Sequence, residues 1–425
     1  MPKSEKMRDG WAVPCVLPTV IKFNNFPPSV KRRTSAHHIR VNLSLEVDVK
    51  ILHFGFRVFL WAGLLLLTAV FLVSAGCSLS EEKSEETRVA GTLNLMTWNV
   101  NNLFDGSDNG FEYDEYLQSA GWSTEKYLGR VNAISSAIGG IKPQPDIIML
   151  QEIESLKIIE DLALSIQGGY SWSYFAKNPG AALGVGIFSR IPLLESRVHS
   201  ITIGGETTPR PVLETRIQAE KGEFIIFVCH WKSKLGGDAV TENVRRASAR
   251  VILRRIRELR ESEPELGVIV AGDLNENHDE FFRQNAAMIC ALLPDDPYCA
   301  QLTGCRGADG EEDSSRQKDF IIISKNKPPL AVHFPKESIA LFSPWLRDLE
   351  NGSYFYKYNW ETIDHFLISA QFFNNTGWEY EKVLIVDSQP FTNSSGVPGS
   401  YNVRTGSGFS DHLPLMLTLK MASNE

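Results

Sequence analysis

The chain has 425 residues, of which 43% are hydrophobic, 22% charged and 10% aromatic. This composition excludes wholesale disorder and allows one large α/β domain, or two ordinary ones, with a substantial buried core. The first 76 residues hold ten basic and four acidic side chains, which leaves a net charge of −14 on the remainder. That charge argues against a general nucleic-acid-coating protein with a broad basic face, but it is compatible with an enzyme that binds one phosphate locally beside a divalent metal ion.

An apolar run at residues 58–73, VFLWAGLLLLTAVFLV, indicates a targeting segment near the front of the chain. Basic residues precede this run, and small residues up to Gly76 lead from it to Cys77. This order of basic, apolar and small residues is typical of a secretory signal. The placement of Gly76 and Cys77 resembles a bacterial lipoprotein signal, which is cleaved before the cysteine and lipidated on its thiol. A plain membrane anchor is the alternative.

These features divide the chain into four parts. Residues 1–48 fit no part of a signal peptide, and we interpret them as a non-native extension, with translation starting near Val49. Residues 49–76 are the signal peptide, residues 77–91 the lipidated cysteine with a polar flexible linker, and residues 92–421 one folded domain. We therefore expect an extracytoplasmic, membrane-anchored protein of the cell envelope.

The remaining cysteines indicate the redox setting. Cys229 lies in an apolar run and is expected to be a buried free thiol. Cys290, Cys299 and Cys305 lie within one short region, and outside the cytoplasm one disulfide among them is expected, with its pairing left open. The spacing contains no Cys-x-x-Cys pair, which argues against a zinc site.

From Thr92 onward, β-type runs alternate with two clear helical patterns, at residues 127–141 and 241–261. The β-type runs, in chain order, are TLNLMTWN, DIIMLQEI, GVGIFSR, RPVLETRIQ, EFIIFVCHW, GVIVAGDLNEN, TIDHFLIS and GFSDHLPLMLTL. If strand geometry continues through Leu274, Asp273 and Asn275 point to one face. Glu276 and Asn277 are interpreted as ordinary turn residues.

Polar side chains stand where these β-type runs meet loops. They are Asn99, Glu152, His230, Asp273, Asn275, Asp364, Asp411 and His412. Any one of them has a plain structural explanation as a surface or turn residue, but active sites gather at such positions in sheet-based folds. Carboxylates without cysteine partners favour a hard divalent ion such as Mg²⁺, and two histidines with a further Asp allow acid–base chemistry near neutral pH.

The chain shows no Gly-rich nucleotide loop, no nucleophile elbow around serine and no His-Glu-x-x-His helix. The residue types therefore indicate metal-assisted hydrolysis of a phosphoester by water. In chain order, the segments TWNV, LQE, CHWKSK, GDLN, TIDHFLIS and SDHLPL resemble the successive motifs of the endonuclease/exonuclease/phosphatase family, the metal-dependent phosphodiesterases related to deoxyribonuclease I and exonuclease III. The resemblance covers residues 92–421. It implies an α/β fold, a DNase I-like four-layer αββα sandwich with two mostly antiparallel sheets.

The resemblance also implies roles for single residues. Glu152 is the principal Mg²⁺ ligand, with Asn99 and Asp411 close to the metal or its waters, and Mn²⁺ or Ca²⁺ are alternatives to Mg²⁺. The remaining roles concern substrate and water: His230 and Asn275 hold the scissile phosphate, Asp273 orients or deprotonates the attacking water, and His412, steadied by Asp364, is its acid–base or charge-stabilising partner. Which group takes the proton is left open. Arg210 matches a family arginine that contacts phosphate, and a plain surface arginine is the alternative.

The substrate is less strongly indicated. HWKSKLGG followed by TENVRRASARVI resembles the secreted bacterial nucleases of the family, and Lys232 and Lys234 either meet neighbouring phosphates or form a solvated loop. Five arginines of the second helix are interpreted mainly as a solvated face; they are Arg245, Arg246, Arg250, Arg254 and Arg255. Six aromatic residues either stack bases or, as we favour, pack beneath a loop; they are Trp345, Tyr354, Phe355, Tyr356, Tyr358 and Trp360.

We therefore expect a membrane-tethered nuclease, assumed monomeric, that hydrolyses DNA or RNA by Mg²⁺-assisted in-line attack of water. The choice between endo and exo action is left open. A phospholipase C or sphingomyelinase-type phosphodiesterase is the first alternative. A non-catalytic surface adhesin on the same fold is the second.

Overall fold

The computed structural model describes residues 91–305 and 313–422. The expected N-terminal extension, signal peptide and linker, with Cys77, lie outside the described residues. Within the part of the chain that is described, no helix is long and apolar enough to cross a membrane.

The first sheet has six strands in the order β17-β18-β1-β2-β4-β3. Its strands are β1 (Thr92–Leu103), β2 (Ile147–Ile153), β3 (Trp172–Ala176), β4 (Gly184–Ser189), β17 (Trp378–Ile385) and β18 (Leu415–Met421). β1 and β2 are parallel, and every other neighbouring pair in the sheet is antiparallel. Alternation along β1 sends Leu93 and Leu95 into one apolar layer, and Met96 and Trp98 into another.

The second sheet has eight strands in the order β11-β12-β13-β16-β10-β9-β8-β5. Its strands are β5 (Leu193–His199), β8 (Val212–Ala219), β9 (Gly222–His230), β10 (Gly267–Asp273), β11 (Leu292–Pro294), β12 (Ile321–Ser324), β13 (Ala340–Phe342) and β16 (Asp364–Ile368). β9 pairs in parallel with β10, as do β11 with β12 and β12 with β13, while the other pairs are antiparallel. Two small hairpins complete the strands; they are β6 (Thr202–Ile203) with β7 (Glu206–Thr207), and β14 (Tyr354–Tyr356) with β15 (Asn359–Glu361).

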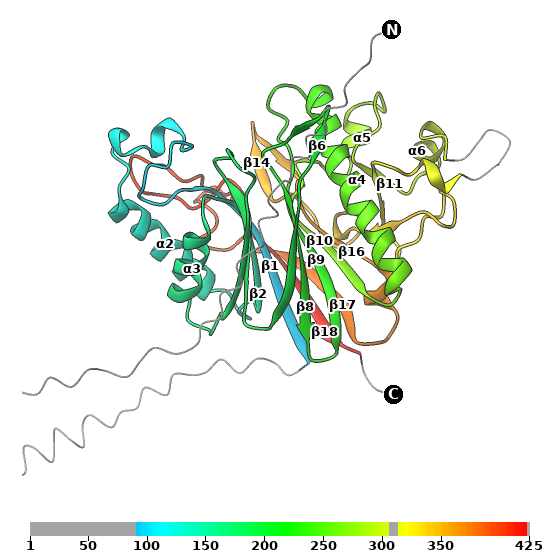
Figure 1. Cartoon of the computed structure of the whole chain (residues 1–425), viewed down its shortest axis with the longest axis horizontal. Coiled ribbons are helices and arrows are strands. Elements are labelled where there is room, and N and C mark those ends of the chain that lie inside the picture. Colours follow the sequence, from blue (N-terminus) through cyan, green and yellow to red (C-terminus); the bar gives the residue numbers. More distant parts are fainter. Residues whose placement is uncertain (1–90, 306–312, 423–425) are drawn as a thin grey trace, which may run out of the picture. The chain divides into compact units, whose positions relative to one another are not determined.

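Helices cover the outer face of each sheet, as Figure 1 shows. α2 (Thr124–Gly139) and α3 (Leu156–Ser165) pack on the first sheet, and α4 (Asp238–Ser262) packs on the second. The inner faces meet in a core to which both sheets contribute. The expected four-layer αββα sandwich with mostly antiparallel sheets is confirmed. The shorter segments are α5 (Glu280–Arg283), α6 (Pro297–Leu302) and 3-10 turns at Asp114–Tyr116, Gln118–Ala120, Ser314–Arg316, Pro344–Leu346 and Ala370–Phe373.

Both predicted helices are present, with starts that local chemistry explains. α2 begins at Thr124 because the Ser123 side chain accepts a hydrogen bond from the backbone N–H of Lys126. α4 begins at Asp238 directly after Gly236 and Gly237, which both have positive φ. The helical spacing of apolar residues marked the buried stripe of each helix but not these first turns.

The expected disulfide is wrong. All four cysteines within the described residues, Cys229 included, are free and buried. Cys290, Cys299 and Cys305 pack with phenylalanine side chains in one apolar cluster, and burial raises the pKa of each thiol. The three residues therefore serve as small apolar side chains, and Cys229 is the buried free thiol that was predicted.

Two of the parallel strand pairs, β1 with β2 and β9 with β10, bring four of the predicted polar residues to one edge of the sandwich. Asn99 on β1 is in register with Gln151, the neighbour of Glu152, on β2. Asp273, at the end of β10, is in register with His230 on β9 and with Asp364 on β16. Because parallel strands end at the same edge, side chains from distant parts of the sequence meet there.

Candidate active site

Glu152 is fixed by its neighbours on β1. Asn99 Nδ2 donates to Glu152 Oε1 at 3.1 Å, and the backbone N–H of Asn102 donates to Glu152 Oε2 at 2.7 Å. Glu152 has a φ of +63°, which is rare for a residue other than glycine, and its side chain is 16% exposed. A carboxylate that is oriented by hydrogen bonds yet still accessible is suited to bind a metal ion.

A buried arginine supports this arrangement and was missed by the sequence analysis. Arg130 of α2 donates to the carbonyl oxygens of Val100, Asn101 and Asn102 at 2.5, 2.6 and 2.6 Å. Asn101 and Asn102 have φ values of +57° and +59°, so the guanidinium stabilises an irregular stretch near the end of β1. This stretch carries the Asn102 N–H that binds Glu152. No local sequence signal distinguishes Arg130 from a surface arginine of an amphipathic helix.

Asp273 lies at the centre of the site and is 2% exposed. Its Oδ2 atom accepts a hydrogen bond from Asn99 Nδ2 at 3.0 Å and lies 3.5 Å from His230 Nε2 and 3.9 Å from His412 Nε2. Burial raises the pKa of the Asp273 carboxyl to about 7, since it disfavours the charged form, while His412 opposes the rise and the nearby Asp364 adds to it. A carboxylate with this pKa can accept a proton near neutral pH.

His412 and Asp364 form a buried pair. His412 Nδ1 lies 2.8 Å from Asp364 Oδ2, which also accepts a hydrogen bond from Ser353 Oγ at 2.6 Å. Burial alone would lower the pKa of His412, but Asp364, and then Asp273 and Asp411, together raise it to about 10. His412 is therefore an imidazolium at neutral pH.

His230, in contrast to His412, is a neutral imidazole at neutral pH. It is 4% exposed, and its Nε2 atom lies 3.7 Å from Glu152 Oε1. Burial, together with the charges of Arg210 and His412, lowers the pKa of His230 well below its ordinary value. The site thus holds one neutral and one cationic histidine on either side of Asp273, and such opposed environments separate acid from base roles.

Asn275 reaches the site by a turn. β10 ends at Asp273, and Asn275 has a left-handed φ of +51°, so the expected strand geometry through Leu274 is wrong. The backbone N–H of Asn275 donates to Asp273 Oδ1 at 2.9 Å, which fixes the turn. Asn275 Nδ2 donates to the carbonyl oxygen of Trp231 at 3.1 Å, and Arg210 Nη1 donates to the same oxygen. Asn275 and Arg210 therefore lie beside each other.

The two lysines after His230 differ. Lys232 is half-buried and donates to the carbonyl oxygens of Ser233 and Leu235 in its own loop, at 3.1 and 3.2 Å. Burial, then the charge of Arg210, lowers the pKa of Lys232. Lys234 Nζ lies 2.6 Å from Glu280 Oε2, in an ion pair that fixes the loop. Lys234 thus stabilises its loop through an ion pair with Glu280. Lys232, in contrast, is close enough to Arg210 for the two positive charges to repel each other.

Two interpretations from the sequence are wrong: Glu276 is a buried residue and not an ordinary turn residue, and Arg245 does not lie on a solvated helix face. Both are fully buried, and Arg245 Nε donates to Glu276 Oε2 at 2.6 Å while Arg245 Nη2 donates to Glu242 at 2.6 Å. Glu276 Oε1 also accepts from the backbone N–H of Ala291 at 2.9 Å. Asn277 is buried too, and its side chain accepts from Thr362 N at 2.8 Å. These groups join α4 to the loop after β10, directly behind the site.

The other arginines of α4 are mostly paired. Arg246 lies 2.8 Å from Asp319, and Arg255 lies 2.9 Å from Glu214. Arg250 lies 3.7 Å from Asp319. The helix therefore does not present the five basic side chains as one solvated face.

The residues present fit a hard divalent ion at Glu152. Asp411, 29% exposed, has its Oδ1 atom 3.9 Å from His412 Nε2, and this nitrogen also lies 3.9 Å from Asp273 Oδ2. Asp273, Asp364 and His412 also bring ligand atoms within 4.8 Å of one another. However, a protonated imidazole offers no lone pair to a metal, so the carboxylate oxygens of Glu152 and Asp411 are better ligands for a hard cation.

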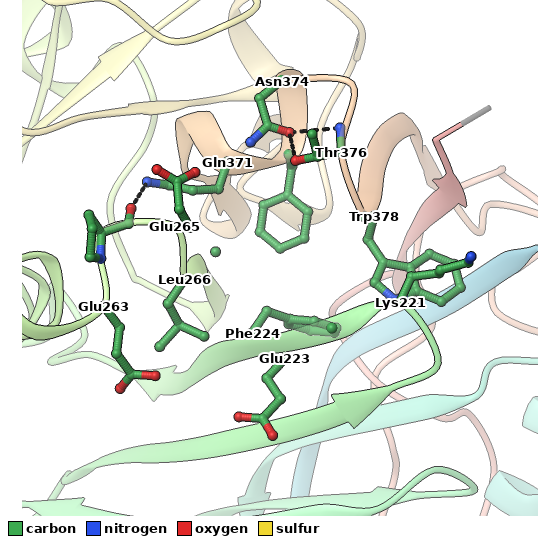
Figure 2. Close-up of a pocket in the computed structure, with 15 residues that line it drawn as sticks. Lys221, Glu223, Phe224, Glu263, Glu265, Leu266, Gln371, Asn374, Thr376 and Trp378 are labelled. Atoms are coloured by element: carbon green, nitrogen blue, oxygen red, sulfur yellow. Dashed lines mark hydrogen bonds between the residues drawn. The ribbon is translucent and has the colours of Figure 1, made fainter. Parts of the chain in front are cut away.

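A pocket of about 560 Å³ lies at the end of β9 and β10 that is opposite to His230 and Asp273. Figure 2 shows the residues that line this pocket. It is lined by Phe224 and Gly267, which pair with each other, whereas His230 pairs with Asp273 at the far end of β9 and β10. Acidic side chains of Glu223, Glu263 and Glu265 also line it. None of the predicted site residues contributes to this pocket.

The family model described as "Endonuclease/Exonuclease/phosphatase family" matches residues 94–287, a stretch that includes Asn99, Glu152, His230 and Asp273. The chain is similar to this family over these residues, which make up just under half of its length. The matched stretch contains four of the six motifs on which the sequence resemblance rests, TWNV, LQE, CHWKSK and GDLN. No curated protein sequence matches the chain.

Several solved structures are similar to this chain in fold. TDP2 of D. rerio, complexed with a single-strand DNA product, is 15% identical, with 78% of this chain and 99% of that chain covered and a TM-score of 0.44. An endonuclease/exonuclease/phosphatase family protein from Bacteroides thetaiotaomicron is 15% identical, with coverage of 79% and 96% and a TM-score of 0.44. The human Nocturnin catalytic domain with a bound sulfate anion is 15% identical, with coverage of 78% and 93% and a TM-score of 0.43.

Proposed function

We propose that this protein is a member of the endonuclease/exonuclease/phosphatase family and a divalent-metal-dependent nuclease that hydrolyses DNA or RNA by in-line attack of water on a backbone phosphate. The observation that carries the proposal is the position of Asp273, whose Oδ2 atom lies 3.5 Å from the neutral His230 and 3.9 Å from the cationic His412. A proton acceptor thus stands between a neutral donor and a fixed positive charge, as hydrolysis of a phosphodiester requires.

Each side chain has a definable task in this reaction. Asp273 orients the attacking water and, with a pKa of about 7, can take its proton. The His412 imidazolium stabilises the negative charge that develops on the phosphate, and Asp364 holds its ring at 2.8 Å. We assign the proton transfer to the pair of Asp273 and His412, whose titrations are linked through their contact.

The phosphate would be bound by His230, Asn275 and Arg210, with Lys232 nearby. Arg210 and Asn275 are half-buried and share the Trp231 carbonyl, so their donors are held together beside Asp273. Glu152, with Asn99 and Asp411, would hold Mg²⁺, or Mn²⁺ or Ca²⁺ in its place. When bound, such an ion polarises the phosphate and offsets its charge.

The hairpin beside the site favours a nucleic acid over a lipid. Among the described residues, β14–β15 is the hairpin that contacts His412, and it presents Tyr356, Lys357 and Tyr358 instead of aliphatic side chains. A phospholipase C-type enzyme would need an apolar surface that enters the bilayer. Tyrosine rings and a lysine are better suited to bases and phosphates.

We also propose that residues 49–76 direct export, that Cys77 carries the lipid, and that residues 77–91 tether the domain of residues 92–421 outside the cytoplasm. The folded domain begins at Thr92, and Asn99 lies seven residues along β1. At about 3.3 Å per residue, Thr92 and Asn99 are separated by roughly 23 Å along the strand.

The test is direct turnover by the purified full-length protein. Plasmid DNA, single-stranded RNA, sphingomyelin and a phosphomonoester are each incubated with Mg²⁺ or with EDTA. We expect Mg²⁺-dependent cleavage of nucleic acid, and a loss of about 10²- to 10⁴-fold in the Asp273→Asn and His412→Gln variants. Glu381→Gln, which alters an exposed carboxylate of β17, is the matched control.

Two results would contradict the proposal. Cleavage of sphingomyelin with intact plasmid and RNA would identify a phospholipase C-type enzyme. No Mg²⁺-dependent turnover of any substrate would favour the adhesin.

A further inference from the structure

A row of tyrosines leads from His412 to the surface of the molecule. Tyr354 forms a backbone bridge with His412, and the centroids of their rings are 4.6 Å apart. Tyr356, two residues further along β14, is stacked on Tyr354 with centroids 6.0 Å apart and an interplanar angle of 15°. Tyr358, in the turn that follows, is 93% exposed. Figure 1 shows β14 at the upper end of the central strands.

The other side of this hairpin anchors it to the domain. The ring of Phe355 packs edge-on against Trp360 at 5.1 Å, and Trp360 packs against the apolar cluster beneath α2 and α3. The backbone of Ser353 also bonds to Glu361 and Leu413, at 3.0 and 2.7 Å. Phe355 and Trp360 thus anchor the hairpin, while about half of Tyr356 and nearly all of Tyr358 remain exposed.

The turn sequence is not one that folding favours. Lys357 and Tyr358 have φ values of +46° and +67°, the conformation that two-residue hairpin turns usually give to Asn and Gly. Left-handed backbone is costly for long or aromatic side chains. The Lys357 ammonium group lies 5.0 Å from the centre of the Tyr356 ring, so a positive charge accompanies the exposed aromatic rings. A strained turn that presents a cation and an exposed ring suggests a role in binding.

We propose that Tyr356 and Tyr358 form a stacking platform for the bases of a single strand of nucleic acid next to the phosphate that is cleaved, and that Lys357 meets the strand's backbone. This inference rests on the proposed nuclease function and names its substrate class. Tyr356 ends β14 and Tyr358 lies in the turn that follows, so the platform offers two separate rings to the bases of one strand. A duplex covers both faces of each base, whereas an unpaired strand leaves them free to stack on tyrosine.

The experiment compares two substrates of equal length, a single-stranded deoxyoligonucleotide and the same strand with abasic sites in place of its nucleosides. We expect Tyr358→Ala in the full-length protein to raise KM for the ordinary strand about ten-fold, since stacking contributes substantially for each base. KM for the abasic strand should not change, because that strand has no bases to stack. Tyr358→Phe should behave like the unaltered protein, because the ring is retained. Tyr298→Ala, at a tyrosine of α6 that is 50% exposed, is the matched control.

The outcomes separate this inference from the function on which it rests. If both strands are cleaved with equal KM and Tyr358→Ala and Tyr356→Ala change neither value, the stacking platform is wrong while the nuclease function stands. If neither strand is cleaved while methyl p-nitrophenyl phosphate is hydrolysed with Mg²⁺, the nuclease function fails and this inference fails with it. A ten-fold rise in KM for the ordinary strand alone, absent in Tyr358→Phe, supports the platform.

Discussion

Replacing Asp364 by Asn removes the negative charge that lies 2.8 Å from His412 Nδ1 while keeping the shape of the side chain. At an effective dielectric constant of about 20, two unit charges at this distance attract each other by roughly 6 kcal/mol, which corresponds to about four pKa units. That is comparable with the whole rise of the His412 pKa from 6.5 to about 10. The remaining carboxylates, Asp273 and Asp411, both lie 3.9 Å away and are opposed by burial.

We therefore expect the pKa of His412 in the Asp364→Asn variant to fall to about 6.5 or below. NMR titration of the histidine ring in EDTA measures this value without interference from metal. At pH 7.5 roughly one tenth of His412 would then be protonated, so kcat/KM should fall by at least about ten-fold at this pH and recover in part as the pH is lowered. A His412 pKa that stays above 9 in the variant would refute the reasoning that Asp364 holds the imidazolium.

Three further predictions follow from the buried charges. The pKa of Asp273 is raised from 3.8 to about 7, so the folded state holds this proton more tightly than the unfolded chain, and the stabilisation is lost as the pH rises through about 7. Without metal, the Tm of the unaltered protein should therefore fall more steeply between pH 4 and 7 than the Tm of Asp273→Asn. Parallel curves would count against the assigned pKa. Arg130→Met should weaken Mg²⁺ binding about 10- to 100-fold in calorimetry and lower the free energy of unfolding by roughly 3 kcal/mol. The reason is that three carbonyls lose a charged donor, and the stretch of β1 beside Glu152 loses its support. Unchanged metal affinity would show that this stretch does not depend on Arg130. Glu276→Gln should lower the free energy of unfolding, measured in urea, by about 3–5 kcal/mol, because it breaks a fully buried ion pair with Arg245. Arg246→Gln, which alters a partly exposed pair, should lower it by about 1 kcal/mol or less. Equal effects of the two substitutions would contradict the burial argument.

The strand ends were predictable because hydrophobic runs and turn residues are local signals. Asn99, His230 and Asp273 each follow an apolar run, and parallel pairing of β1 with β2 and of β9 with β10 then brings them to one edge. The family resemblance supplied the four-layer arrangement, which no local pattern could specify.

The supporting contacts were not predictable from local signals. Arg245 and Glu276 are 31 residues apart and meet only when α4 packs on the second sheet, so neither sequence position reveals that it is buried. Arg130 likewise reaches residues about 30 positions earlier in the chain. The left-handed backbone of Asn275 replaced an expected strand because the Asp273 carboxylate binds the following N–H, and such a turn competes with strand geometry.

The most direct test of the central claim is the Mg²⁺ dependence of phosphodiester cleavage in the unaltered protein and in Glu152→Gln, which keeps the side-chain size but removes the charge expected to bind metal. We predict that EDTA abolishes cleavage by the unaltered protein, that Mg²⁺ restores it, and that Glu152→Gln requires a Mg²⁺ concentration higher by about 100-fold or is inactive. Cleavage that survives EDTA, or identical Mg²⁺ dependence in the two proteins, would contradict the account.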